Sequence, residues 1–248
     1  MVSQDQEVLK PSGAFLRFEG EPLPDFRTVR VRFRKTGSLQ FISHLDTQRV
    51  MMRILVRAGI PMWYTQGFNP HAKVVFALPL PVGVESECEL MDLRICRDVS
   101  EKEILNRLNQ ALTDEMRALE VYIPERKFQE IDSCDYALTF KSPKITEETA
   151  AELEHFLTTP PLTILKKTGS GEREIELTRH LRRLNIQSEK GLLKVFVNMP
   201  AGQDKETVSP LSVCEKIIDH LALYEKSADE DFRVVRLHMR DDRMREFA

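Results

Sequence analysis

Aromatic, amide and imidazole side chains gather in residues 64–73, which read YTQGFNPHAK. Aromatic rings can stack on the unpaired bases of a single-stranded nucleic acid, and a lysine can hold a phosphate. A packed loop with a turn at Asn69-Pro70 is the structural alternative, and the sequence leaves it open. The candidate nucleic-acid-binding residues of this stretch are Tyr64, Gln66, Phe68, Asn69, His71 and Lys73.

A stripe of arginines precedes this stretch: Arg49, Arg53 and Arg57 recur every four residues, a spacing that places them on one side of a helix. Residues 27–73 contain nine Lys or Arg and a single acid, although the whole chain has a net charge of −3. Such asymmetry is typical of a surface that meets phosphate or an acidic partner. We therefore add the three arginines to the candidate nucleic-acid-binding residues.

Catalytic and metal-binding chemistry has less support. His44 and Asp46 are two positions apart on an expected helix, so they do not face each other, and Asp46 fits the first turn of that helix. We predict no metal site. His71 acting as a general base on RNA is a weak catalytic candidate that rests on analogy with ferredoxin-like RNA nucleases. Whether His44, Asp46 and His71 come together stays open.

The four cysteines are scattered, with no CxxC pair and no metal-finger spacing, so we expect reduced thiols. Hydrophobic residues make up 42% of the chain and charged residues 30%, as in soluble globular proteins. No apolar run is long enough for a transmembrane helix, and residues 1–15 lack the apolar core of a secretory signal. We expect a cytoplasmic protein that does not bind membranes.

The order of expected elements is β-α-β-β-α-β, twice. In the first half, residues 28–37 alternate as a strand, and 43–61 form a helix that begins at Ser43 and stops before Pro61. Strands at 73–80 and 88–96, a helix at 100–112 and a strand at 118–125 follow. In the second half we expect strands at 135–141, 161–168, 191–199 and 232–240, with helices at 146–159 and 209–223.

This order predicts an α+β fold made of two tandem ferredoxin-like domains with antiparallel sheets. The first domain would span residues 27–126 and carry the basic helix and the QGFNPH motif. The second would span residues 133–241. Residues 1–26 have no periodicity and are expected to form a flexible N-terminal arm.

Four segments resemble a known family: RFRKTGSLQFISHLD, RAGIP, QGFNPHAKVVFALPLPVGVES and REIELTRHLRRL. They look like the radical-SAM-linked protein family, a bacterial domain of unknown function found beside or fused to radical-SAM proteins. The resemblance covers about residues 27–240. The family commonly has Pro where this chain has Ala72, and often Ser where it has Val75, so the local turn could differ here.

The resemblance implies a radical-SAM partner that uses an iron-sulfur cluster and S-adenosylmethionine. This chain lacks the cysteine triad of such enzymes, so we expect no cofactor of its own. The leading hypothesis is a non-catalytic RNA-binding or substrate-presenting subunit that works with a radical-SAM modifying enzyme, on tRNA or rRNA. The alternatives are a protein adaptor for that enzyme without RNA contact, and a stand-alone RNA-processing enzyme.

Overall fold

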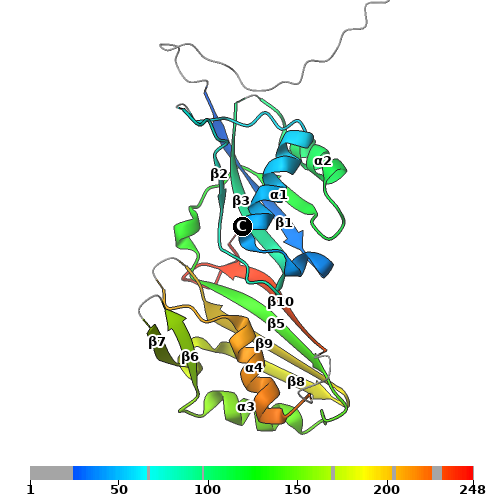
Figure 1. The fold of residues 1–248 in the computed structure, drawn as a ribbon, viewed down its shortest axis with the longest axis vertical. Helices are drawn as coiled ribbons and strands as arrows, with labels where there is room; N and C mark the ends of the chain where they lie inside the picture. The colour runs from blue at the N-terminus through cyan, green and yellow to red at the C-terminus, as the bar shows by residue number, and fades with distance from the viewer. Residues whose placement is uncertain are drawn as a thin grey trace, which may run out of the picture.

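The computed structural model of the chain describes residues 25–65, 68–96, 98–168, 171–202, 205–224 and 231–247. Within these residues the protein is a mixed α+β fold with four α-helices and one large sheet (Figure 1). The predicted α+β class is confirmed. No helix of the described residues has both the length and the hydropathy that a membrane span requires.

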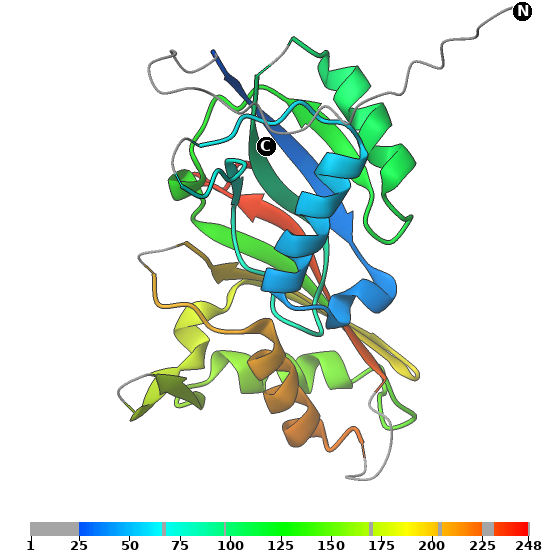
Figure 2. The same cartoon turned by 45° about the horizontal axis from the view of Figure 1, so that its top comes forward.

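The N-terminal half follows the predicted element order. Strand β1 is followed by the short 3-10 helix η1 and then by α1 (Figure 2). The bounds are β1 (Arg27–Lys35), η1 (Gly37–Phe41), α1 (His44–Arg57), β2 (Val74–Phe76), β3 (Glu85–Ile95), α2 (Glu101–Ala111) and β4 (Ala118–Tyr122).

The C-terminal half contains two further helices, two 3-10 turns and six strands. Its bounds are η2 (Phe128–Glu130), β5 (Ser133–Lys141), α3 (Thr149–Thr158), β6 (Thr163–Thr168), β7 (Gly171–Glu176), η3 (Leu177–His180), β8 (Arg182–Glu189), β9 (Leu192–Pro200), α4 (Pro210–Leu221) and β10 (Phe232–Arg240).

Helix α1 forms where the sequence predicts it. The backbone N–H of Asp46 donates to the Ser43 side chain over 3.1 Å, which satisfies one of the free N–H groups of the first turn. The chain leaves the helix through Gly59, whose φ of +63° favours glycine. Met51 and Leu55 are fully buried against β1 and β3 and fix which side of α1 faces the sheet.

The large sheet has the strand order β4-β1-β3-β10-β5-β9-β8, with β2 also paired to β3. All of its pairings are antiparallel except one: β10 runs parallel to β3, with Val235 opposite Glu85 and Arg236 opposite Ser86. The two halves therefore share one sheet, where separate antiparallel sheets were expected. Figures 1 and 2 show α1, α2 and α4 on the same face of that sheet.

Two predicted strands need correction. Residues 161–168 were expected inside the second sheet, but β6 leaves it and pairs only with β7 in a two-stranded hairpin. The place is taken by β8, where half-buried Leu184 and Ile186 alternate with exposed Asn185 and Gln187. The strand expected at 73–80 is limited to Val74–Phe76, because a proline has no N–H for a sheet and the chain turns away before its two Leu-Pro pairs.

The arginines of β1 do not form an open basic face. Arg30 is fully buried, and its Nε and Nη2 donate to the two oxygens of Asp92 over 2.7 and 3.0 Å. Its guanidinium lies 4.2 Å from the centre of the Phe128 ring and 5.3 Å from that of Phe247. Residues of η2 and of the C-terminal segment thus cover this side of β1, which alternation alone does not reveal.

A buried polar junction joins the halves where β3 meets β10. Arg236 Nη1 donates to Glu89 over 2.9 Å, and its Nη2 donates to the carbonyl of Pro79 over 2.9 Å. The carbonyl of Pro79, in the first Leu-Pro pair, thus contacts the last strand of the sheet. Nearby Lys35 is almost fully buried, and burial lowers its pKa, an effect that the charge of Glu89 opposes.

Candidate nucleic-acid interface

Residues 62–65 and 71–73 run antiparallel beside the end of β3 as the two arms of a hairpin. Met62 pairs with Ile95, and the backbone N–H of Trp63 donates to the carbonyl of Arg94 over 2.7 Å. The returning segment is anchored at the same place, since the N–H of Arg94 donates to the carbonyl of Lys73 over 3.2 Å. The loop is thus mounted on a sheet strand, an arrangement that gives exposed side chains a fixed position.

The tip of the hairpin is closed by Thr65 and His71. The N–H of Thr65 donates to the carbonyl of His71 over 2.9 Å, and the N–H of His71 donates to the Thr65 hydroxyl over 3.2 Å. The same hydroxyl lies 3.0 Å from Nδ1 of the His71 ring. These contacts give His71 a positioning role in the loop, which fits the structural alternative for this residue.

Closing the loop leaves its aromatic side chains outside. Phe68 is fully exposed, Tyr64 is 41% exposed, and Asn69 and Lys73 are exposed as well. The Phe68 ring is therefore open to solvent, where it could contact a ligand. Gln66, the remaining candidate of this stretch, lies outside the described residues.

An arginine in contact with two aromatic rings stands beside the hairpin. The rings of Phe26 and Trp63 are 5.1 Å apart, and the Arg94 guanidinium lies 4.2 Å from the first and 5.4 Å from the second. No carboxylate of the described residues forms an ion pair with Arg94. The two rings position its charge.

The sequence interpretation missed these three residues. Phe26 was assigned to the flexible arm, of which residues 1–24 lie outside the described residues. Arg94 was hidden in an expected strand, and Trp63 followed the end of a helix. One sequence feature points to this place: Trp63, the single tryptophan of the chain, directly precedes Tyr64.

The arginine stripe of α1 is partly used inside the protein. Arg49 Nη1 lies 3.0 Å from Asp46, and Arg57 donates to the carbonyl of Ala111 at the end of α2. Arg53 is exposed, and no ion pair within the described part of the chain engages it. The described contacts do not connect the stripe to the hairpin.

His44, Asp46 and His71 occupy different surroundings. The His44 ring packs edge-on to Phe76 with ring centres 5.7 Å apart, and burial lowers its pKa, assisted by the charges of Arg236 and Lys35 and opposed by that of Glu89. Asp46 serves the start of α1, where the Ser43 hydroxyl and then Arg49 hold the pKa of its carboxyl below the usual value. The described hydrogen bonds join neither of them to His71.

Comparisons with known proteins add a family and little else. The profile of a family described as "Uncharacterized protein conserved in bacteria (DUF2344)" matches residues 28–210. No curated protein matches the chain. Among solved structures, an unknown protein from Galdieria sulphuraria is similar to it at 10% sequence identity and a TM-score of 0.25, over 86% of this chain and 99% of that one.

Proposed function

The chain belongs to this bacterial family of uncharacterized proteins, and we propose that it is a non-catalytic RNA-binding subunit that holds single-stranded RNA at the hairpin of residues 62–73. The observation that carries the proposal is the exposed Phe68 on an anchored loop whose base carries Lys73 and, across the strand pairing, Arg94. An aromatic face that is free of protein contacts suits an unpaired base, because bases inside a duplex are already stacked.

The phosphate contacts would come from the two cations at the base of this loop. Lys73 and Arg94 are adjacent across the strand edge, since their backbones share a hydrogen bond. Neither has a carboxylate partner among the described ion pairs, in contrast to Arg30, Arg32 and Arg49. Unpaired cations beside an exposed ring are the combination that single-strand-binding surfaces use.

The fold is compatible with this role. When the strands of each half are numbered in chain order, leaving out β6 and β7, both halves of the sheet have the strand order 4-1-3-2. These are β4-β1-β3-β2 in the first half and β10-β5-β9-β8 in the second, and neighbouring strands in each are antiparallel. We infer two ferredoxin-like units fused through β3 and β10, with the β6-β7 hairpin inserted in the second. The fold alone does not imply RNA binding, which rests on the hairpin.

The partner enzyme belongs to the same proposal. The resemblance to radical-SAM-linked proteins supports a cytoplasmic radical-SAM enzyme that modifies tRNA or rRNA, with this chain presenting the RNA. The iron-sulfur cluster and S-adenosylmethionine would belong to that enzyme. Neither the family profile nor the geometry names the modification.

A second candidate function, a protein adaptor, is favoured by the outer side of α1. Leu45 and Val56 are 61% and 62% exposed there, next to Arg49 and Arg53. Apolar side chains mixed with arginine are typical of protein interfaces, whereas phosphate-binding surfaces need no exposed leucine.

Fluorescence anisotropy with a labelled RNA of about 12 nucleotides, a length within the usual range for one binding surface, tests the RNA proposal. We expect the single strand to bind more tightly than its duplex. Phe68→Ala should weaken the single-strand complex roughly 5- to 100-fold, since stacking contributes about 1–3 kcal/mol per base. Phe41→Ala is the matched control, because Phe41 is also exposed but lies in η1. Equal affinities of Phe68→Ala and the wild type would contradict the proposal.

A further inference from the structure

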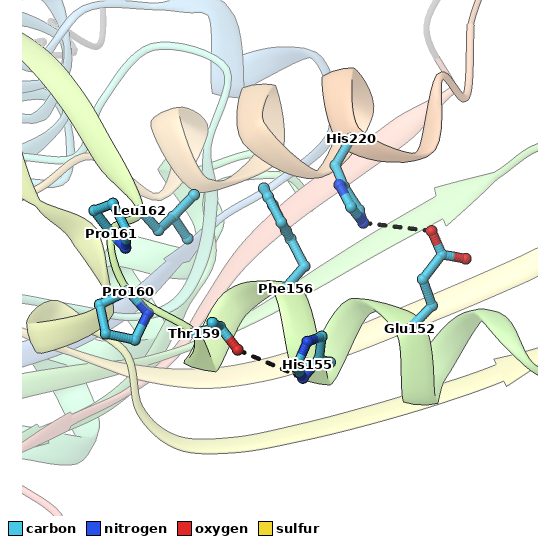
Figure 3. Close-up of a pocket in the computed structure, with 8 residues that line it drawn as sticks. All are labelled: Glu152, His155, Phe156, Thr159, Pro160, Pro161, Leu162 and His220. Atoms are coloured by element: carbon cyan, nitrogen blue, oxygen red, sulfur yellow. Dashed lines mark hydrogen bonds and ion pairs between the residues drawn. The ribbon is translucent and has the colours of Figure 1, made fainter.

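A hollow of about 390 Å³ opens between α3 and α4 in the second half of the chain (Figure 3). Its apolar lining consists of Phe156, Pro160, Pro161 and Leu162. A second hollow of about 380 Å³ shares three of these residues, so the two form one groove that continues along α4. A groove of this kind accepts an apolar side chain from outside.

The walls of the groove are held by paired side chains. The rings of Phe156 on α3 and His220 on α4 are stacked, with centres 3.7 Å apart and planes tilted by 7°. His220 Nε2 lies 3.4 Å from a carboxylate oxygen of Glu152, as Figure 3 shows. The stack and the ion pair both bridge the two helices, so the groove exists without a bound partner.

The helices that form the groove are acidic. Residues 149–158 of α3 and 210–221 of α4 contain four carboxylates and one lysine, Lys216. The groove itself is lined by Glu152, Asp219 and Lys216, so its carboxylates outnumber its lysine. An occupant should therefore combine an apolar side chain with neighbouring positive charges.

The outer side of α1 has this composition. Leu45 and Val56 are more than half exposed, and Arg49 and Arg53 lie between them on the same helix face. The Asp46 carboxylate that contacts Arg49 is itself exposed, so the pair is weak and can exchange for another carboxylate. The helix and the groove are thus complementary in both charge and hydrophobicity.

We propose that the groove between α3 and α4 binds α1 of a second copy of this chain. The two surfaces differ, so the contact is made either twice within a two-fold dimer or head-to-tail along a ring or filament. The proposal rests on the protein-docking role of α1 and does not involve the hairpin that we assign to RNA.

Charge exchange between the surfaces tests the proposal by analytical ultracentrifugation at low salt. The wild type should self-associate as its concentration rises. The groove variant Glu152→Lys/Asp219→Lys and the helix variant Arg49→Glu/Arg53→Glu should each remain monomeric, because each places like charges in contact. An equimolar mixture should associate again, since each variant supplies the charge that the other needs. All four substitutions are at exposed positions, so circular dichroism should show both variants folded.

Three outcomes would overturn the proposal: a wild type that stays monomeric, self-association that persists in both single variants, or a mixture that stays monomeric. Anisotropy with the same RNA separates this result from the RNA proposal. The helix variant retains Phe68, Lys73 and Arg94, so RNA binding by a monomeric protein would leave the hairpin assignment intact while self-docking fails.

Discussion

The guanidinium of Arg236 and the carboxylate of Glu89 form an ion pair between β10 and β3, with Nη1 and Oε1 2.9 Å apart and both side chains less than a tenth exposed. The Tyr136 hydroxyl lies 3.3 Å from Nε of the same guanidinium. The two strands come from opposite halves of the chain, so this pair lies at the only parallel pairing among the described strands of the sheet. If Glu89 is removed, the buried charge of Arg236 is left without a compensating carboxylate at this place.

Glu89→Gln should therefore lower the free energy of unfolding by about 3–5 kcal/mol, the cost of leaving one partner of a buried pair uncompensated. Urea denaturation followed by circular dichroism measures this change. Glu103→Gln is the matched control, since its partner Arg107 forms an exposed pair and the change should stay within about 0.5 kcal/mol. Equal losses in the two variants would show that the junction does not depend on the buried pair.

The pair of Glu85 and Arg233 predicts a pH dependence. Hydrogen bonds from Arg233 lower the pKa of the buried Glu85 carboxyl from its ordinary 4.5, so the folded state favours the charged form. The pair therefore stabilises the fold above pH 4.5, and this contribution is lost as the pH falls through the lower folded pKa.

Glu85→Gln should reduce the free energy of unfolding by about 1–3 kcal/mol at pH 7, the usual range for hydrogen bonds to a charged group. The difference from the wild type should shrink on acidification below pH 4.5. Urea unfolding at several pH values measures this, with the exposed Glu154→Gln as control. A difference that stays constant down to the acid transition would show that the Arg233 contact does not stabilise the charged carboxyl.

Salt dependence should separate the hairpin from the α1 stripe. Each single-strand phosphate contact contributes roughly 0.7 to the log–log salt slope. Lys73→Gln/Arg94→Gln should thus reduce the magnitude of the log–log salt slope of RNA binding by about 1.4, because two phosphate contacts are lost. Arg49→Gln/Arg53→Gln/Arg57→Gln should leave the slope nearly unchanged, because two of these arginines contact other groups of the protein and no described contact connects the stripe to the hairpin. A larger loss in the triple variant would move the RNA contact to α1.

The thiols should differ in reactivity. Burial raises the pKa of Cys134 to about 11, and burial also raises the pKa values of Cys88 and Cys214. Cys96 is only partly buried. We expect a disulfide reagent to modify one thiol rapidly in the native protein and all four after denaturation, with Cys96→Ser removing the rapid reaction. Rapid labelling of Cys88 in the native protein would contradict the burial of the junction.

Much of the fold follows from local patterns in the sequence. The starts of α1, α2 and α4 are marked by serines at positions 43, 100 and 209, and alternation marks most strands, because caps and periodicity are local properties. The pairing of β3 with β10 depends on residues far apart in the chain, and no local pattern encodes it. The strand β8 was missed because its charged ends and half-buried interior resemble a connecting segment.

The candidate site was predicted in part. Residue types alone single out Tyr64, Phe68 and Lys73 as candidates, while their exposure is visible only in the structure. The contribution of Arg94 depends on strand register, which brings it beside Lys73, and on the packing of Phe26, a residue about 70 positions earlier in the chain. The sequence also does not show that Arg57 is engaged inside the protein, because its acceptor, the carbonyl of Ala111, comes within reach only once α2 has packed against α1.

The position of β10 between β3 and β5 also determines when the strands of the sheet can pair during synthesis. During synthesis β1, β2, β3 and β4 can find one another early, since all their mutual partners lie within residues 27–122. The inner edges of β3 and β5 must wait for residues 232–240, the last strand to emerge. Until then the growing chain has two open sheet edges that can pair with other chains, and their protection depends on how soon β10 is completed.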